Sequence, residues 1–202
     1  GTERPRLMDE QERRTVAYHE AGHALIASLL PGADPVRRVT IIPHGRSLGV
    51  TSQVPEEERY NYSVDDLSTR LTVLMGGRVA EQIGLCQATT GAEKDLQQAT
   101  RLARGMVARW GMNEEVGPVS YQVGDSDSFL GRTPGLEQEY SETTATLIDQ
   151  EVKRLLEEAY QRATDLLSQD QDKLERLVQA LLRDETLDAA AIAAALNGAI
   201  DR

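Results

Sequence analysis

The sequence predicts a mainly α-helical α+β fold, with a small β-sheet near one long helix and a helical C-terminal half. Apolar side chains recur at helical spacing over most of the chain, and β-branched residues gather between residues 36 and 54. The 202 residues are enough to bury a sizeable core. No apolar run approaches the roughly 20 residues that a membrane-spanning helix needs.

Turn signals divide the N-terminal part into short elements. Pro31-Gly32 ends the first amphipathic helix, and a turn at Pro43-His44-Gly45 separates two strands. The expected elements are, in order, a helix from about Asp9 to Leu30, a strand from Val36 to Pro43, a strand from Leu48 to Val54 that alternates apolar and polar residues, and a charged loop from Pro55 to Tyr62.

The rest of the chain is predicted to be helical apart from one long loop. Ser63 is a suitable cap for a helix whose apolar residues run from Leu67 to Ile83. The expected elements after it are a helix from about Ala92 to Trp110, opened by Thr89-Thr90-Gly91, a loop from Gly111 to Pro134, a long helix from Gly135 to about Leu167, and two shorter helices near Asp172–Arg183 and Ala189–Ala199. The loop is longer than most structureless connections, so we expect it to be functional or ordered by a partner.

Composition excludes several classes of function. The formal net charge of −11 and the pI near 4.8 argue against a nucleic-acid-binding surface. The single cysteine, Cys86, excludes an internal disulfide framework and fits a reducing compartment. We expect Cys86 to be a small buried apolar side chain, and we expect the chain as given to be soluble.

The run His19-Glu20-Ala21-Gly22-His23 is the most informative motif. Residues four apart lie on one face of a helix, so His19 and His23 can present two imidazoles to one zinc ion. Glu20 lies on the neighbouring flank, where a carboxylate can hold and deprotonate a water molecule. Gly22 costs about 1 kcal/mol relative to alanine inside a helix, which suggests that another element packs closely against it.

The residues alone leave the third zinc ligand open. A hydrolytic zinc site takes three protein ligands, and no histidine follows His44, so the third ligand should be a carboxylate unless His44 folds back. Glu81, on a mostly apolar helix, and Asp95, in the first turns of the next helix, are the two candidates. Each has an ordinary alternative explanation: a solvent-exposed helix face for Glu81, and a favourable helix dipole for Asp95.

Several motifs together resemble the FtsH family of ATP-dependent, membrane-anchored zinc proteases. The resemblance extends from about Arg13 to Leu187, with the motifs in the family's order. The motifs are Tyr18-His19-Glu20-Ala21-Gly22-His23-Ala24, Val39-Thr40-Ile41-Ile42-Pro43, Gly76-Gly77-Arg78-Val79-Ala80-Glu81, Thr89-Thr90-Gly91-Ala92-Glu93-Lys94-Asp95-Leu96-Gln97-Gln98-Ala99-Thr100, Trp110-Gly111-Met112 and Tyr140-Ser141-Glu142.

The resemblance implies roles for the candidate site residues. The acidic residue of the family's second signature is the third zinc ligand, and it maps onto Asp95. Glu81 then becomes a candidate for orienting a ligand imidazole from the outer shell. The chain departs from the family at His44, where an arginine is expected in the turn, and we expect this histidine to be exposed to solvent.

The resemblance also implies how the whole protein is organised. Residues 1–202 would form one zinc metalloprotease domain, with a catalytic part at about 9–134 and a helical C-terminal part at about 135–200. The ATPase domain, which binds ATP and Mg²⁺, and the membrane segments would lie upstream of this chain. Members form homo-hexamers in a bacterial inner membrane or an organellar membrane, with the protease domain on the cytoplasmic or equivalent side.

The expected activity is zinc-dependent hydrolysis of peptide bonds in unfolded or damaged membrane and cytosolic proteins. One zinc ion per chain would be the cofactor, with Glu20 as the base. The residues Leu48, Gly49, Val50 and Thr51 are candidates for an edge strand that binds substrate as an added strand, although an ordinary protected edge is equally compatible with the pattern. The alternative function is a catalytically silent scaffold of the same hexamer, which would need none of the four chemical residues.

Overall fold

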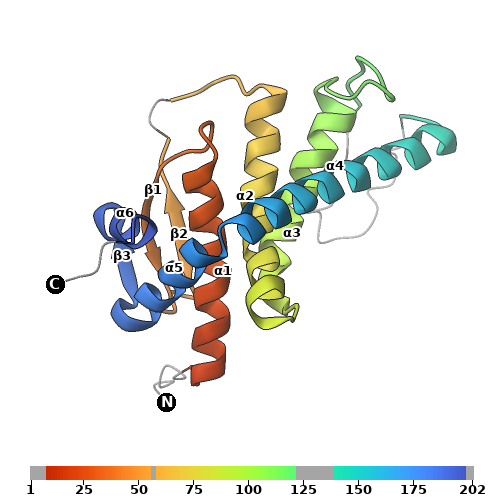
Figure 1. Ribbon diagram of the computed structural model, residues 1–202. Helices are drawn as coiled ribbons and strands as arrows, with labels where there is room; N and C mark the ends of the chain where they lie inside the picture. Colours follow the sequence, from red (N-terminus) through yellow and green to blue (C-terminus); the bar gives the residue numbers. More distant parts are fainter. Residues whose placement is uncertain (1–7, 56–57, 122–138, 199–202) are drawn as a thin grey trace.

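The computed structural model describes residues 8–55, 58–121 and 139–198 of the chain. Figure 1 shows a small sheet beside helix α1, with α1, α2 and α3 side by side and the long helix α4 crossing them. The helices are α1 (Glu10–Leu29), α2 (Val64–Leu85), α3 (Glu93–Arg104), α4 (Glu142–Gln169), α5 (Gln171–Asp184) and α6 (Ala189–Leu196). The strands are β1 (Val36–Thr40), β2 (Val50–Gln53) and β3 (Thr186–Asp188). The prediction of a mainly helical α+β fold is confirmed.

Helices α1 and α2 each begin at a side-chain cap, α1 at Asp9 and α2 at the expected Ser63. The Asp9 carboxylate accepts a hydrogen bond of 2.8 Å from the backbone N–H of Glu12. Ser63 and Asp66 form a reciprocal capping box at the start of α2, in which each side chain accepts from the other residue's backbone N–H. Because these caps satisfy backbone donors that a helix leaves free, they fix both starts to the residue.

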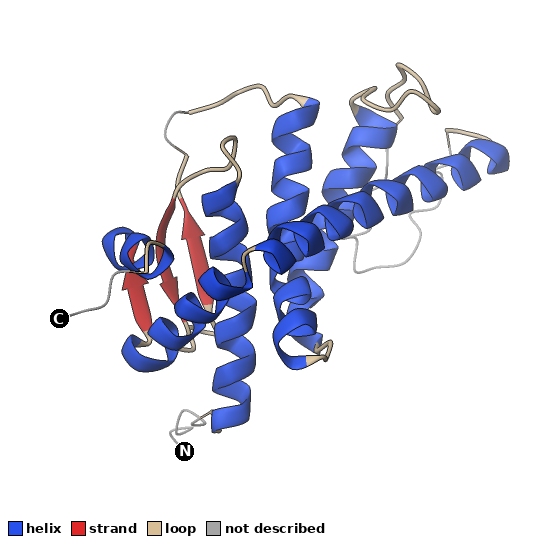
Figure 2. Cartoon of the chain, viewed as in Figure 1, coloured by secondary structure: helices blue, strands red, loops and turns tan. Residues whose placement is uncertain are grey.

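The sheet has the order β2-β1-β3, and both pairings are antiparallel. Figure 2 shows the strands beside α1, with α6 close to β3. Both expected strands are present but shorter than expected, and β2 lies at an edge of the sheet. The third strand, β3, was not predicted: Leu187 pairs with Val39 of β1 across almost 150 residues of sequence. The C-terminal part of the chain thus completes the sheet of the N-terminal part.

The helix expected from Ala92 to Trp110 is present in three pieces. A 3-10 turn at Thr90–Ala92 leads into α3, which continues as a π-helical turn at Gly105–Arg109. The ring of Trp110 packs on Gly105, where a Cβ atom would approach Cζ3 of that ring to 2.7 Å. Within the described residues, the expected loop from Gly111 begins as predicted, and its part beyond residue 121 lies outside them.

Two further predictions need correction. The long helix begins at Glu142 and not at Gly135, because Ser141 caps it by accepting a hydrogen bond of 3.2 Å from the Thr144 N–H. Residues 135–138 lie outside the described part. Cys86 is exposed and not buried. It occupies the C-cap of α2 in the left-handed conformation, with φ 51°, and so lies beyond the helical residues whose spacing places side chains on the packed face.

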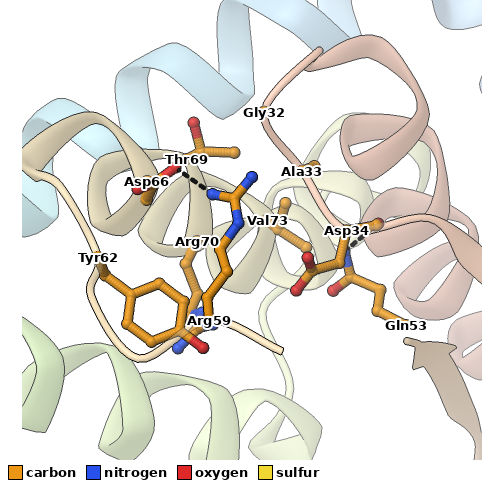
Figure 3. Close-up of a pocket in the computed structure, with 10 residues that line it drawn as sticks. All are labelled: Gly32, Ala33, Asp34, Gln53, Arg59, Tyr62, Asp66, Thr69, Arg70 and Val73. Atoms are coloured by element: carbon orange, nitrogen blue, oxygen red, sulfur yellow. Dashed lines mark hydrogen bonds and ion pairs between the residues drawn. The ribbon is translucent and has the colours of Figure 1, made fainter. Parts of the chain in front are cut away.

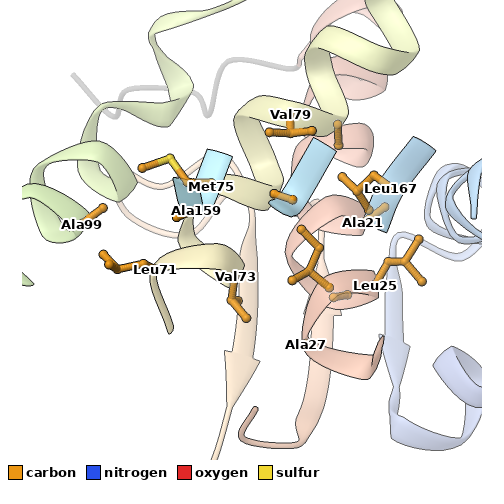
Figure 4. Close-up of a cluster of buried hydrophobic side chains, with 14 of the residues drawn as sticks. Ala21, Leu25, Ala27, Leu71, Val73, Met75, Val79, Ala99, Ala159 and Leu167 are labelled. Atoms are coloured by element: carbon orange, nitrogen blue, oxygen red, sulfur yellow. The ribbon is translucent and has the colours of Figure 1, made fainter. Parts of the chain in front are cut away.

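One hydrophobic core joins the helices. It contains small and branched residues from α1, α2, α3 and α4, and Figure 4 shows this cluster where the helices meet. The labelled members are Ala21, Leu25, Ala27, Leu71, Val73, Met75, Val79, Ala99, Ala159 and Leu167. Helices α5 and α6 pack on α1 and on the sheet, respectively. In the described ranges no helix combines the length and the apolar character needed to span a membrane.

Candidate metal centre

The two histidines of the first motif lie on the face of α1 that packs on α2. This contact is close because glycine meets glycine: a Cβ atom on Gly22 would come within 2.2 Å of the carbonyl oxygen of Gly76. A Cβ atom on Gly76 would in turn lie 2.9 Å from the carbonyl oxygen of Gly22. The expectation that another element packs tightly on Gly22 is confirmed, and the two backbones bring the histidines against α2.

Gly77 forms the wall of α2 that faces both imidazoles. A Cβ atom at this position would lie 2.5 Å from Cε1 of His19 and 2.6 Å from the Nε2 atoms of both His19 and His23. Any side chain larger than hydrogen would occupy the volume of the rings. The sequence therefore needs glycine at this position so that the histidines can approach α2.

Three atoms with lone pairs meet at one point in front of this wall. The Nε2 atoms of His19 and His23 are 3.0 Å apart, and Oδ2 of Asp95 lies 2.9 Å from the first and 3.1 Å from the second. Asp95 reaches them from the first turn of α3. In the described part of the chain, these three residues form the group of potential metal ligands that converge on one site.

The opposite ring nitrogen of each histidine is held by an acceptor. Nδ1 of His19 lies 3.1 Å from Oε2 of Glu81, and Nδ1 of His23 lies 2.7 Å from the carbonyl oxygen of Val73. Since both partners can only accept, each Nδ1 carries the proton and donates it. In the neutral imidazoles the Nε2 lone pairs are thereby directed towards Asp95, which is the tautomer that a metal ligand requires.

Glu81 is fully buried, so the expectation of a solvent-exposed helix face for it does not hold. Its Oε2 accepts from His19, and its Oε1 accepts from the hydroxyl of Thr89. The carboxylate lies behind the imidazole, whereas Asp95 lies in front of it with both Nε2 atoms. This geometry corresponds to the roles that the family resemblance implies for the two acidic residues.

The carboxylates around His19 favour a positive charge at the point where the two Nε2 atoms and Asp95 meet. Burial lowers the pKa of His19, but the hydrogen bonds to Asp95 and Glu81 and the nearby charge of Glu20 outweigh it and raise this pKa to about 10. Burial likewise acts to raise the pKa of Asp95, yet the hydrogen bonds from the two histidines hold it well below its usual range. A proton on His19 can meet this need, and so can a metal ion that replaces the proton.

The residues fit zinc. Nitrogen and oxygen ligands at about 2.0–2.1 Å from a tetrahedral zinc ion lie about 3.3 Å from one another. The three atoms are 2.9–3.1 Å apart, so displacements of a few tenths of an ångström would accommodate the ion. Two imidazoles and one carboxylate leave a fourth position for water, as in hydrolytic zinc sites, whereas structural sites close with four protein ligands.

Glu20 connects this centre to the sheet. Its carboxylate is buried, and Oε2 accepts a hydrogen bond of 2.6 Å from the hydroxyl of Thr51 on β2. Gly49, just before β2, packs on the same side chain, because a Cβ atom there would lie 2.9 Å from Cγ of Glu20. The candidate base is therefore held between α1 and the edge strand.

The other edge-strand candidates lie along the same border of the sheet. Val50 and Thr51 pair with Thr40 and Val39 of β1, and no strand pairs with the other side of β2 among the described residues. Leu48 precedes the strand and is 50% exposed. His44 is exposed in its turn, as expected, and it pairs through its backbone with Ser47.

A polar pocket lies where β2 ends. Figure 3 shows Arg59 spanning it to reach Asp66, with a separation of 3.0 Å, and Asp34 directed into it beside Gln53. Gln53 is the last residue of β2, and Val73, whose carbonyl oxygen accepts from His23, lies in the wall. The pocket thus adjoins both the edge strand and the metal centre.

Comparison with known proteins agrees with this geometry. The model of peptidase family M41 matches residues 6–195. The chain belongs to peptidase family M41. This M41 domain is 52% identical over 188 residues to the ATP-dependent zinc metalloprotease FtsH of Thermobaculum terrenum, which covers 93% of the chain and 29% of that protein. It is 48% identical over 192 residues to FtsH of Pelobacter propionicus, which covers 95% of the chain and 31% of that protein.

The predicted resemblance to the FtsH family is confirmed. The M41 domain spans less than a third of the length of these two curated relatives. The four residues His19, Glu20, His23 and Asp95, which the family's motifs contain, are brought together in one place.

Sequence reasoning missed two residues of the centre, Thr89 and Gly77, as contributors to its geometry. Thr89 stands in the second signature and Gly77 in the glycine pair before Glu81, so both were quoted as motif residues without a physical role. It also missed the hydrogen bond from Thr51 to Glu20, since no spacing rule relates a helix residue to a strand 31 residues later.

Proposed function

We propose that this M41 domain is a zinc-dependent endopeptidase, with His19, His23 and Asp95 as the ligands of one zinc ion per chain and Glu20 as the base. The observation that supports it best is the convergence of two Nε2 atoms and a carboxylate oxygen within 3.1 Å of one another. Each imidazole is fixed from behind in the ligand tautomer. Glu81 is the residue that orients His19.

The chain's own residues supply the acid–base chemistry. Zinc, when bound, would supply a Lewis acid that polarises the scissile carbonyl and makes water a stronger acid. Glu20 accepts the proton of the attacking water and returns it to the leaving amine. The hydroxyl of Thr51 donates to one carboxylate oxygen of Glu20 and so leaves the other oxygen to receive that proton.

Strand β2 is proposed to bind the substrate as an added strand. Its outer side is free of strand partners in the described structure, and it leads from the base towards the pocket at Gln53. Main-chain hydrogen bonds to such an edge tolerate many side chains, as cleavage of unfolded chains requires. Val50 pairs with Thr40 of β1, so Val50→Pro would disturb the pairing that holds this edge strand in place, and we expect it to abolish peptide cleavage and to leave zinc bound. Retained cleavage would count against the edge model.

The wider context is proposed from the relatives. Their name, ATP-dependent zinc metalloprotease, supports protein substrates and a use of ATP, and we propose that an ATPase domain binding ATP and Mg²⁺ lies in the part of the protein that this chain does not match. We propose that the substrates are unfolded or damaged polypeptides. We also propose that the full-length protein is a homo-hexamer in a bacterial inner or an organellar membrane, with this domain on the cytoplasmic or equivalent side. No observation supports the alternative of a silent scaffold.

The test is zinc content together with cleavage of an unstructured protein such as casein. Glu20→Gln keeps the shape of the side chain and removes the base, so we expect full zinc content and loss of cleavage. Asp95→Ala removes a ligand, so we expect loss of both. Glu20→Gln with wild-type cleavage would refute the role of the base, and Asp95→Ala with full zinc content would make Glu81 the third ligand.

A further inference from the structure

Thr89 lies between the two acidic groups that act on His19. It follows α2, which carries Glu81, and it precedes the 3-10 turn Thr90–Ala92 that leads into α3 with Asp95. The hydroxyl of Thr89 contacts Oε1 of Glu81 and the backbone N–H of Gly91, the latter at 3.2 Å.

The directions of these hydrogen bonds follow from the groups present. The N–H of Gly91 can only donate, so the Thr89 oxygen accepts there and the residue acts as the N-cap of the turn. The single hydroxyl proton of Thr89 is then free to be donated to the Glu81 carboxylate. The hydroxyl thus donates to Glu81 on α2 and accepts from Gly91 in the 3-10 turn.

The backbone of Thr89 is anchored as well. Its carbonyl oxygen accepts a hydrogen bond of 2.8 Å from Nη2 of Arg78, which lies on α2 one turn before Glu81. The main chain of Thr89 is therefore fixed relative to α2, and this keeps the hydroxyl within hydrogen-bonding distance of Glu81. This arrangement reduces the conformational freedom that an exposed link between two helices would have.

His19 is held at both ends by groups that Thr89 connects. Glu81 accepts from Nδ1 at 3.1 Å, and Asp95 lies 2.9 Å from Nε2. The hydroxyl of Thr89 fixes the first group by a direct hydrogen bond and the second by capping the start of its helical segment. A shift of this hydroxyl would move the two carboxylates relative to the same imidazole.

We propose that Thr89 is a positioning residue of the metal centre, whose hydroxyl links Glu81 on α2 to the segment that carries Asp95 and so holds His19 and Asp95 in the geometry that binds zinc. The proposal rests on the proposed function, since it assumes that the three converging residues are zinc ligands. It differs from that function in its consequence, because Thr89 touches neither the ligand atoms nor the substrate side of the centre.

The test compares variants at Thr89 with its neighbour Thr90. Thr89→Val keeps the shape and removes the hydroxyl, Thr89→Ser keeps the hydroxyl, and Thr90→Val makes the same chemical change at an exposed position. Zinc affinity is measured by competition with a chromophoric chelator, and the visible spectrum of the Co²⁺-substituted protein reports the ligand geometry. Thermal melts of the metal-free proteins show whether each variant folds, and Thr89→Ala is a second hydroxyl-free variant if Thr89→Val unfolds.

We expect Thr89→Val to weaken zinc binding about 10-fold, the lower end of the effect of losing a direct partner of a metal ligand, because Thr89 acts on His19 through Glu81, and to change the cobalt spectrum. Thr89→Ser and Thr90→Val should bind zinc within about threefold of wild type. Combining Thr89→Val with Glu81→Gln should weaken binding by less than the product of the two single effects, because the two residues act on one imidazole.

Two results would overturn the proposal. One is a folded Thr89→Val protein with wild-type zinc affinity and an unchanged cobalt spectrum. The other is a Thr89→Ser protein as defective as Thr89→Val, which would show that the methyl group and not the hydroxyl matters. Failure of the proposed function would appear separately, as a wild-type protein that binds no zinc or as an Asp95→Ala protein that binds it normally.

Discussion

Replacement of Gly77 by alanine should eject zinc while leaving the fold intact. The new Cβ atom would lie 2.5–2.6 Å from Cε1 and Nε2 of His19 and from Nε2 of His23, where ordinary contacts need about 3.5 Å. The rings must therefore retreat by about 1 Å, whereas zinc ligands tolerate deviations of about 0.2 Å. We expect zinc affinity to fall at least about 100-fold, which is the upper end of the effect of losing one outer-shell partner.

Gly84→Ala is the matched control for this change. It lies on the same helix, and its Cβ atom would come within 2.2 Å of the Tyr18 ring, away from the ligand nitrogens. Both variants should lose about 1–3 kcal/mol of unfolding free energy through overpacking, partly offset by the better helix propensity of alanine. Only Gly77→Ala should lose zinc in a chelator competition. A folded Gly77→Ala protein that binds zinc within tenfold of wild type would refute the packing argument.

Three further predictions follow from the charges and hydrogen bonds. The pKa of His19 is about 10 despite its burial, so zinc binding should release about one proton near neutral pH, and zinc affinity should rise with pH. Calorimetry in buffers of different ionisation enthalpy measures the number of protons released, and a release of no proton would contradict the prediction. Hydrogen bonds, chiefly from Arg154, hold the pKa of Glu151 below its usual value, so its stabilisation is complete above the unfolded pKa of about 4.3 and is lost as pH falls through the lower folded value. Urea titrations should therefore show a shallower acid loss for Glu151→Gln than for wild type, and parallel curves would argue against this contribution. Thr51→Val should lower kcat for peptide cleavage about tenfold with zinc content unchanged, because Glu20 loses a charge-assisted hydrogen bond. An unchanged kcat would show that this hydrogen bond does not position Glu20.

Helix positions were predictable because local chemistry determines them. Asp9 and Ser63 begin α1 and α2 through hydrogen bonds to residues three positions later, which a sequence displays directly. The start of α4 was placed too early, because the apolar spacing continues upstream of its cap at Ser141. The strand at Thr186–Asp188 was missed for the opposite reason: it has only three residues and exists by pairing with a distant strand.

The histidine ligands of the candidate site could be predicted from the sequence, but the contacts that orient them could not. The spacing of His19 and His23 on one helix face follows from helix geometry alone. The choice between Glu81 and Asp95 depends on which side of an imidazole each carboxylate reaches, and that is set by how α2 and α3 pack on α1. Spacing along the chain carries no such information, so a family resemblance was needed to make the choice.

The position of the bound zinc ion decides whether His19, His23 and Asp95 are its ligands. Crystals of the zinc-loaded domain, measured on both sides of the zinc absorption edge, give an anomalous difference map that marks the ion. We expect one peak per chain, within bonding distance, about 2.0–2.2 Å, of His19 Nε2, His23 Nε2 and Asp95 Oδ2. A zinc-loaded crystal whose peak contacts Glu81 in place of Asp95, or lies away from both histidines, would contradict it.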